Sequence, residues 1–324
     1  MLVISDGQVD RLLPVADAID FVRSAFAAFS RGDVVCPQRL PLPLKPENAV
    51  LLSMPAFDGR LYAGVKLIGV QPANAARGLP TVRASYMLFD AQTCEPLAVM
   101  GATRLTAIRT GAAGGVAASL LARADAATLA LFGAGAQAET QLLAALAVRP
   151  VRDVWVASGS DLETANFIAR MQDRVAARLH HAATSAQALE NADIIVTATN
   201  SRNPVFSDAD VKPGCHVTGI GAFTSEMQEI PDATMARAAV YLDADEAAWS
   251  ESGELAGAFA RGAIARDHAV GEIGALIDGR IAGRRDDRQI TVFKSVGLAA
   301  QDLVCAAAVY ERARDAGIGI EAAL

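Results

Sequence analysis

Cysteine is scarce in this 324-residue chain, and its four thiols lie far apart in the sequence. They form no C-x-x-C pair and have no histidine pair nearby: Cys36, Cys94, Cys215 and Cys305. This spacing excludes a disulfide framework and a zinc framework. We expect free or buried thiols in a reducing cytoplasm, and no bound metal.

Long uninterrupted apolar runs are also missing, although the mean hydropathy is positive at +0.27. The longest run, Thr110–Ala122, is bounded by Arg109 and Arg123 and is too short to cross a bilayer. The first residues show no basic segment followed by an apolar one, which a secretion signal would have. We therefore expect a cytoplasmic protein with no membrane partner.

Basic residues are outnumbered, because 29 Lys and Arg stand against 36 Asp and Glu, for a net charge of −7. This balance argues against binding to nucleic acid or to an anionic membrane. The four histidines have no nucleophile or metal spacing, and neither G-x-S-x-G nor H-E-x-x-H occurs. The sequence therefore offers no hydrolase or metalloprotease signature.

A glycine-rich turn stands out near the middle of the chain. The apolar run Thr128–Phe132 is followed by Gly133-Ala134-Gly135-Ala136-Gln137-Ala138 and then by a helix-prone segment. This is the G-x-G-x-x-A form of the dinucleotide fingerprint. The first glycine allows a tight turn, the second lets a pyrophosphate approach the backbone, and the alanine lets the helix pack closely on the strand. The N-terminus of that helix would face the phosphates.

The chain is long enough for two domains, and its texture changes along its length. Up to residue 100, two helices (5–13 and 15–29) precede short strands separated by prolines, which predict an antiparallel or mixed sheet: 49–54, 61–70, 82–89 and 97–100. After a helix at 104–124, strands and helices alternate and predict a parallel, doubly wound sheet: strands 128–132, 153–157, 178–181, 194–198, 216–220 and 239–242, with helices 136–148, 162–172 and 185–191. This context strengthens the assignment of the dinucleotide fingerprint, because the strand 128–132 that precedes the glycine-rich turn is the first strand of the alternating series. A strand at 290–296 and a final helix follow.

Three charged residues lie in apolar surroundings before the glycine-rich turn. Lys66 interrupts an apolar strand, and it is either on an exposed face or directed into a site. Arg39 and Arg109 have apolar neighbours, and each could form a structural salt bridge. If the three converge, the arginine forks suit the carboxylate of an amino or imino acid.

The choice between NAD and NADP depends on the residues that follow the strand 153–157. An acidic residue there would bind the ribose hydroxyl of NAD, and an arginine would accept the extra phosphate of NADP. This chain has Ser158, Gly159 and Ser160, and Asp161 comes late enough to begin the next helix. The small polar residues leave room for a phosphate, so we expect NAD(P)(H), with a preference for NADP.

Several runs together resemble the ornithine cyclodeaminase/mu-crystallin family, in family order from about residue 37 to 305. They are Gly64-Val65-Lys66, Arg77-Gly78-Leu79-Pro80-Thr81-Val82, Leu105-Thr106-Ala107-Ile108-Arg109-Thr110, Phe132–Ala138, Thr197-Ala198-Thr199-Asn200 and Thr291–Ala299. The resemblance implies an α/β protein with a Rossmann NAD(P)-binding domain at 116–299. It also implies a discontinuous α+β sheet domain, 1–115 with 300–324, that binds substrate and forms a homodimer.

The resemblance also implies roles for individual residues. Lys66 and Arg109 would be catalytic and hold the substrate carboxylate, and Arg39 and Thr81 would complete the substrate pocket. The cofactor would be bound by residues of the glycine-rich turn and of the strand ends: Thr110, Gly133, Gly135, Ala136, Gln137, Ser158, Ser160, Thr197, Thr199 and Ser295.

The family contains several activities, and two positions discriminate between them. Its ornithine enzymes carry a glutamate and an aspartate where this chain has Leu52 and Phe223. Both acids serve the free side-chain amine and its proton transfers, so their loss argues against cyclodeamination. We expect a reductase of small cyclic imino acids. The alternatives are an ornithine cyclodeaminase, an alanine-type amino-acid dehydrogenase, or a crystallin-like protein that binds NADPH or another small ligand.

Overall fold

The computed structural model describes residues 1–45 and 48–323, and it divides into two compact units. Unit 1 comprises Met1–Arg109 together with the chain from Leu298 onward, and unit 2 is Thr110–Gly297. We expected these divisions after residues 115 and 299. Among the described residues, no helix combines the length and the apolar character that a membrane span requires.

Unit 1 is built on a seven-stranded mixed sheet in the order β15-β1-β6-β5-β4-β3-β2. Strands β2 to β6 form an antiparallel meander, β1 pairs in parallel with β6, and β15 pairs antiparallel with β1. The strands are β1 (Leu2–Ile4), β2 (Leu40–Leu44), β3 (Ala49–Phe57), β4 (Tyr62–Val70), β5 (Val82–Asp90), β6 (Pro96–Gly101) and β15 (Ile320–Glu321). The mixed sheet was predicted, but β1, β2 and β15 were not.

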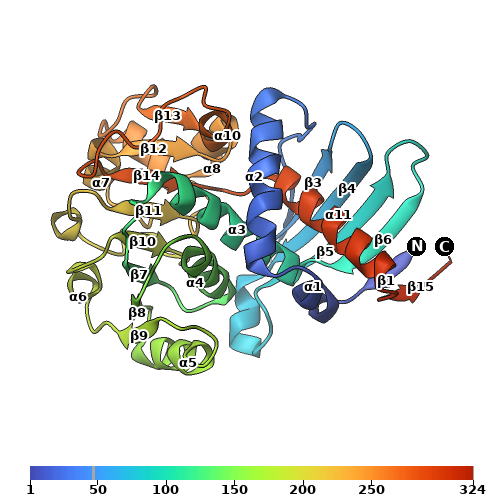
Figure 1. Cartoon of the computed structure of the whole chain (residues 1–324), viewed down its shortest axis with the longest axis horizontal. Coiled ribbons are helices and arrows are strands. Elements are labelled where there is room, and N and C mark those ends of the chain that lie inside the picture. Colours follow the sequence, from blue (N-terminus) through green and yellow to red (C-terminus); the bar gives the residue numbers. More distant parts are fainter. Residues whose placement is uncertain (46–47, 324) are drawn as a thin grey trace. The chain divides into compact units, whose positions relative to one another are not determined.

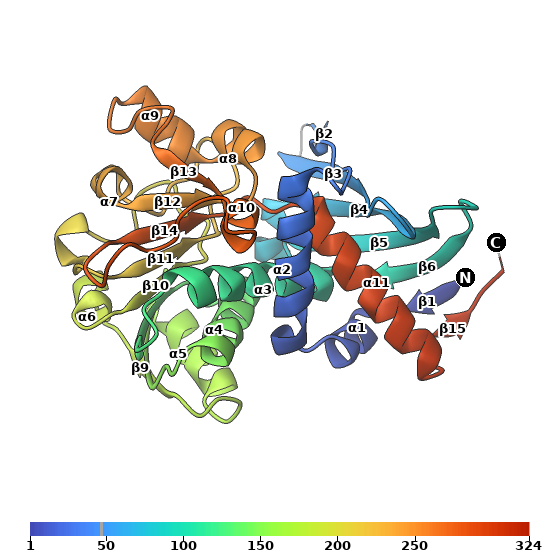
Figure 2. The same cartoon turned by 45° about the horizontal axis from the view of Figure 1, so that its top comes forward.

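Two long helices cover one face of this sheet. They are α2 (Val15–Arg31) and α11 (Ala299–Asp315), which lie side by side (Figure 2). Helix α11 contacts β3, β4 and β5. The shorter elements of unit 1 are α1 (Asp6–Leu12) and the 3₁₀ turn η1 (Pro72–Arg77). Ser5 and Gln8 form a capping box at the N-terminus of α1.

Unit 2 contains the predicted parallel sheet, which has eight strands in the order β13-β12-β14-β11-β10-β7-β8-β9 (Figure 1). They are β7 (Thr128–Phe132), β8 (Asp153–Ala157), β9 (Arg178–His181), β10 (Ile194–Thr197), β11 (His216–Gly219), β12 (Ala239–Leu242), β13 (Ala269–Glu272) and β14 (Thr291–Lys294). From β7 the chain moves first to β8 and β9 on one side, and then to β10 on the other. The topological switch point, where such sheets bind ligands, therefore lies between β7 and β10.

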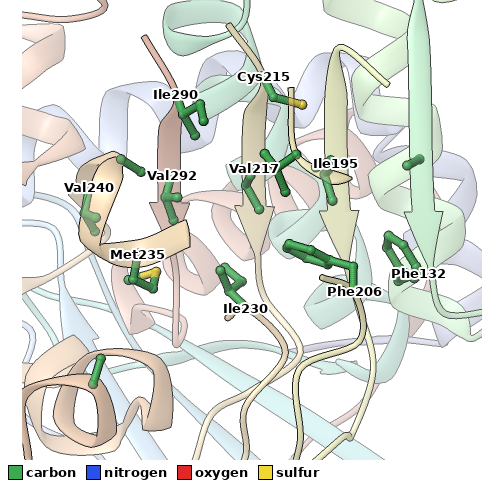
Figure 3. Packing of buried hydrophobic residues seen from close by; sticks show 14 of the residues in the cluster. Phe132, Ile195, Phe206, Cys215, Val217, Ile230, Met235, Val240, Ile290 and Val292 are labelled. Carbon is green, nitrogen blue, oxygen red and sulfur yellow. The ribbon is translucent and has the colours of Figure 1, made fainter. Parts of the chain in front are cut away.

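Helices cover both faces of this sheet, and the strands alternate between two hydrophobic clusters. Leu129 and Leu131 belong to one cluster with α3, α4 and α5, while Ala130 and Phe132 belong to the other, which Figure 3 shows. The helices are α3 (Thr103–Leu121, which begins in unit 1), α4 (Ala136–Val148), α5 (Asp161–Met171), α6 (Ser185–Leu189), α7 (Asp232–Arg237), α8 (Asp245–Glu251), α9 (Ala258–Ala260) and α10 (Ile273–Ile277), with a 3₁₀ turn η2 (Asp208–Asp210) and a π-helical turn η3 (Gly253–Gly257).

The first part of unit 2 agrees with the prediction in detail. Strands β7, β8 and β9 and helix α4 have the predicted bounds. Small residues of α3 permit close packing against α4. A Cβ at Gly111 would lie 2.6 Å from Thr140, and one at Gly114 would lie 1.9 Å from the Gln141 amide oxygen.

Candidate cofactor and substrate sites

The turn after β7 has the geometry that the fingerprint predicts. Gly133 adopts a φ of +117°, which side-chain-bearing residues rarely tolerate. A Cβ there would also lie 2.5 Å from the Ala198 carbonyl oxygen, which follows β10. The Gly133 N–H donates to the Ala157 carbonyl at 2.8 Å, so the turn joins the ends of β7 and β8.

The second glycine opens the start of α4 to a ligand. Gly135 is the N-cap of α4 and provides no side-chain cap, and a Cβ built on it would meet no atom within 4 Å. The amide groups of the first helical turn have no acceptor within the helix, and the helix dipole favours an anion there. Ala138 is fully buried against the sheet. These features fit the pyrophosphate of a dinucleotide.

At the end of β8 the predicted serines form a small polar loop. The Ser158 hydroxyl donates to the Ser160 carbonyl at 3.0 Å and lies 2.9 Å from the Thr164 hydroxyl. Ser160 caps α5 by accepting from the Glu163 N–H. Asp161 is the first residue of α5, as expected, and its carboxylate lies 3.0 Å from His181 Nε2.

Two buried polar atoms near this edge of the sheet have no hydrogen-bond partner within the described part of the chain. They are Thr197 Oγ1, at the end of β10, and Gln137 Oε1, in the first turn of α4. Unpartnered buried polar atoms are costly, so both fit a site that a ligand completes. Two other predicted residues are held by carboxylates: Thr199 by Glu229, and Ser295 by Asp243 at 2.7 Å.

Lys66 lies on the helix-covered face of the sheet in unit 1. Gly64, Lys66 and Ile68 are buried, whereas Leu67, on the opposite face, is exposed. The Lys66 ammonium donates to Asp302 Oδ2 at 2.7 Å, and both side chains are fully buried. Asp302 is in the first turn of α11, which packs on β4.

Arg109 reaches the same carboxylate from α3. Its Nε donates to Asp302 Oδ1 at 3.2 Å, and its Nη1 donates to Gln301 Oε1 at 2.8 Å. Asp302 therefore joins β4, α3 and α11 through two cationic partners. Of the three residues whose convergence would suit a carboxylate, Lys66 and Arg109 come together here, and Arg109 does so through a salt bridge to Asp302, a residue that was not predicted.

Burial lowers the pKa of Lys66 from its ordinary 10.5 to about 7. Asp302 opposes this change, whereas the positive charges of Arg109 and Arg39 add to it. The one carboxylate of the cluster cannot balance two buried cations when Lys66 is protonated. The cluster therefore favours an anionic ligand, such as the carboxylate of an amino or imino acid.

Of the remaining predicted positions, Arg39 and Thr81 lie in unit 1, and Thr110 lies on α3 where unit 2 begins. Arg39 immediately precedes β2 and is half-buried, and Thr81 is exposed just before β5, where its carbonyl accepts from the Gln71 N–H. Thr110 is buried, and its carbonyl accepts from Gln141 Nε2 at 2.8 Å. The substrate role of Thr81 stays a prediction, as do the cofactor contacts of the individual residues.

The two discriminating positions carry apolar side chains in the structure. Leu52 is buried on β3 and pairs with Ile68 of β4, so it lies on the same sheet face as Lys66. Phe223 is half-buried in the loop after β11. Neither position supplies a group that can transfer a proton.

A family model for the ornithine cyclodeaminase/mu-crystallin family matches residues 1–317. The chain belongs to this family. A curated relative, the Delta(1)-pyrroline-2-carboxylate reductase of Bacillus cereus, is 37% identical over 321 residues, which cover 98% of each chain.

Two solved structures of the ornithine cyclodeaminase/mu-crystallin family have the same architecture. Delta(1)-pyrroline-2-carboxylate reductase of Thermococcus litoralis, in complex with NADH and L-proline, has a TM-score of 0.96 and 32% identity, covering 99% of this chain and 100% of that one. An archaeal alanine dehydrogenase dimer with bound NAD has a TM-score of 0.94 and 33% identity, and the match covers 100% of this chain and 99% of that one.

Sequence reasoning missed Gln301 and Asp302 in unit 1, and Glu229 and Asp243 in unit 2. One signal for Asp302 was available, because it is an acidic residue next to Gln301 in the mostly apolar start of the last helix, a few residues after the motif ending at Ala299. The helical period alone could not show that it faces Lys66, which lies 236 residues away in the chain.

Replacing Asp302 by Asn should destabilise unit 1 by about 3–5 kcal/mol, because it leaves two buried cations without a carboxylate. The folded-state pKa of Lys66 lies below its unfolded value and falls further without Asp302. The loss should therefore be larger at about pH 6, where the wild-type lysine is charged and pairs with Asp302, than at about pH 9, where it is neutral. Urea unfolding at both pH values measures this, with Asp315→Asn on the same helix as the control. An equal loss in the two variants contradicts the assignment.

Proposed function

We propose that this protein is an NAD(P)H-dependent oxidoreductase that reduces small cyclic imino acids of the Δ1-pyrroline-2-carboxylate or Δ1-piperideine-2-carboxylate type. The observation that carries the proposal is the buried cluster of Lys66, Arg109 and Asp302, which has more positive than negative charge. The reductase from Bacillus cereus and the related structure that holds NADH and L-proline support the same substrate class.

The substrate carboxylate is the natural counter-ion for this cluster. Arg109 offers a planar fork of donors, and Gln301 and Asp302 hold its orientation from α11. Arg39 adds positive charge to the same region, as its effect on the pKa of Lys66 indicates. Arg39 and Thr81 complete the pocket in this proposal.

Reduction of a C=N bond adds a hydride to carbon and a proton to nitrogen. The reduced nicotinamide, when bound, supplies the hydride. Lys66 supplies the proton, directly or through a water, and is left as a neutral amine that solvent protonates again. A pKa of about 7 suits this role, because the ammonium and the amine then have similar free energies near neutral pH.

The other activities of the family are second candidates. Alanine-type dehydrogenation uses the same hydride chemistry in reverse. The similarity to the archaeal alanine dehydrogenase structure supports this activity as a second candidate. Cyclodeamination of ornithine is less well supported, because Leu52 and Phe223 supply no proton-transferring group. A purely ligand-binding protein would not need a buried lysine whose pKa is lowered toward 7.

The cofactor in this proposal is a nicotinamide dinucleotide, with NADP preferred. The support for NADP is the loop after β8, where Ser158 and Ser160 replace the acidic residue that would repel a 2′-phosphate. We also keep the cytoplasmic localisation as a prediction from the unpaired, widely spaced cysteines.

We further propose a homodimer formed through the sheet of unit 1. Leu40 (69% exposed) and Leu42 (56%) on β2 lie on the same face as Leu67 (47%) on β4, because both Leu40 and Leu67 pair with Ser53. This face is opposite to the one that α2 and α11 cover. An exposed apolar strip of this kind is typical of a protein interface.

Purified protein should oxidise NADPH or NADH in the presence of cyclic imino acids, measured side by side with α-keto acids plus ammonia, and with ornithine and NAD. Lys66→Ala should lower kcat by about 10²–10⁴-fold, because it removes the proton donor. Lys45→Ala, at an exposed position, is the control. Near-normal turnover by Lys66→Ala overturns the role of Lys66, and binding of NADPH without any turnover favours the ligand-binding alternative.

The rate of imine reduction should fall above about pH 7, because the pKa of Lys66 is lowered to about 7 and only the ammonium form donates a proton. In the reverse direction the rate should rise over the same range, because the neutral amine accepts the proton. Profiles of kcat/KM measured between about pH 6 and pH 9 test this. Removing the Asp302 carboxylate by Asp302→Asn should move the change to lower pH. A profile with no ionisation in this range contradicts the proposal.

In sedimentation equilibrium the protein should have twice the 33.7 kDa mass of the chain. Leu67→Lys should shift the mass toward that of one chain, because it places a charge in the apolar strip. Leu162→Lys, at another exposed leucine, in unit 2, should leave the mass unchanged. A wild-type protein with the mass of one chain rejects the dimer.

A further inference from the structure

The carboxylate of Glu229 is fully buried in unit 2 and accepts four hydrogen bonds. Oε1 accepts from the Thr199 N–H at 2.6 Å and from the Thr199 hydroxyl at 2.8 Å. Oε2 accepts from the Gly221 N–H at 2.8 Å and from the Ala222 N–H at 3.0 Å. Every donor comes from a segment that follows a strand of the parallel sheet.

These donors belong to two neighbouring loops. Thr199 follows β10, and Gly221 and Ala222 follow β11, the next strand in the sheet. The loops approach each other so closely that a Cβ at Gly221 would lie 2.1 Å from the Thr199 carbonyl oxygen and 2.5 Å from Glu229 Oε1. One carboxylate therefore fixes the separation of two loops at the ligand-binding edge of the sheet.

Two more buried charged groups support Glu229 from the other side. Glu254, in the π-helical turn η3, accepts from the Glu229 N–H at 2.8 Å through Oε1. Its Oε2 accepts from the Ser252 hydroxyl at 3.0 Å and lies 3.2 Å from the Lys294 ammonium. Lys294, the last residue of β14, also donates to the Ala222 carbonyl at 2.6 Å.

The hydrogen bonds to Glu229 favour its ionised form. The pKa of its carboxyl is raised, because burial and the neighbouring Glu254 carboxylate outweigh the Lys294 ammonium and the Thr199 donors, which lower it. Three of the four groups that face the two oxygens are backbone N–H groups, which can only donate, and the Thr199 hydroxyl already accepts from the Ser201 N–H, so the ionised carboxylate is the form that satisfies all four. A glutamine at this position would direct its amide N–H at a backbone N–H, and at least one buried donor would lose its acceptor.

None of these contacts reaches the adenosine side of the proposed cofactor site. The turn at Gly133–Gln137 and the serine loop after β8 belong to β7, α4 and β8, whereas Glu229 acts on the loops after β10 and β11. Thr197, whose buried hydroxyl has no partner in residues 1–45 and 48–323, is two residues before the Thr199 that Glu229 holds. In a dinucleotide fold the half of the sheet that carries the fingerprint holds the adenosine and the other half holds the nicotinamide, so the loops after β10 and β11 lie on the nicotinamide side of the switch point. The two sides meet at Ala198, whose N–H donates to the Phe132 carbonyl at 2.8 Å.

We propose that Glu229 is a positioning residue for the nicotinamide end of the cofactor, acting through the loops after β10 and β11, with Glu254 and Lys294 keeping its carboxylate in place. This rests on the proposed function only in requiring a nicotinamide dinucleotide, because it makes no assumption about the substrate. Its effect should be confined to ligands that carry the nicotinamide ring.

The test compares two ligands by isothermal titration calorimetry: NADH, and ADP-ribose, which lacks the nicotinamide. In Glu229→Gln the Kd for NADH should rise by about tenfold or more, while the Kd for ADP-ribose should stay within about twofold of the wild-type value. If the wild type binds NADPH better than NADH, then NADPH and 2′-phospho-ADP-ribose take their places. A general loss of folding would weaken the binding of both ligands. A difference between the changes in the two Kd values therefore distinguishes positioning from a merely structural role.

Glu190→Gln, at an exposed position in the same unit, is the matched control and should bind both ligands as the wild type does. Glu254→Gln carries the same test if Glu229→Gln does not fold, and a smaller split in the same direction is expected. The proposal is overturned if the variant binds both ligands equally more weakly, or if it binds both as tightly as the wild type does. A wild type that binds neither ligand overturns it together with the cofactor assignment, whereas a split without imine turnover supports it and rejects only the proposed reaction.

Discussion

One buried carboxylate, that of Asp302, holds together three segments of unit 1 that lie far apart in the chain. Lys66 and Arg109 are 236 and 193 residues away from it in sequence, and both direct their charges at its two oxygens. Burying three charges is costly, and an apolar cluster of similar volume would stabilise a fold at least as well. The cost is understandable if the cluster serves a ligand, because a second carboxylate would compensate its surplus of positive charge when Lys66 is protonated.

Unit 2 uses a buried carboxylate in a different way. Glu229 faces backbone N–H groups and a hydroxyl, and all of its accepting positions are occupied within the protein. Asp243 does the same for the segment after β14, where it accepts from the Ser295 hydroxyl and from the N–H groups of Val296 and Gly297. These carboxylates fix loops at the ends of strands, whereas Asp302 fixes the charged side chains of Lys66 and Arg109.

Local patterns predicted the parts of the fold that local physics decides. The helix α4 and the strands around it have the expected bounds, because the glycine turn, the apolar period and the helix-forming residues all agree there. Strands β1 and β15 are too short to carry a pattern, and β2, with Pro41 and Pro43, has a strand signal weakened by its prolines. These three strands, of which β15 and β2 are the two edges of the sheet, form because neighbouring strands supply their hydrogen-bond partners, which is a tertiary effect.

The sequence by itself determined that a dinucleotide turn follows β7, that a doubly wound sheet surrounds it, and that Lys66 and Arg109 are charges in apolar surroundings. It left the direction of Lys66 open, because an apolar strand with one lysine is compatible with either face. Only the tertiary structure decided this, since α11 covers one face of β4 and presents Asp302 there while Leu67 remains exposed on the other. The reason is physical: a buried ammonium is stable only beside its counter-charge, and that counter-charge comes from the far end of the chain.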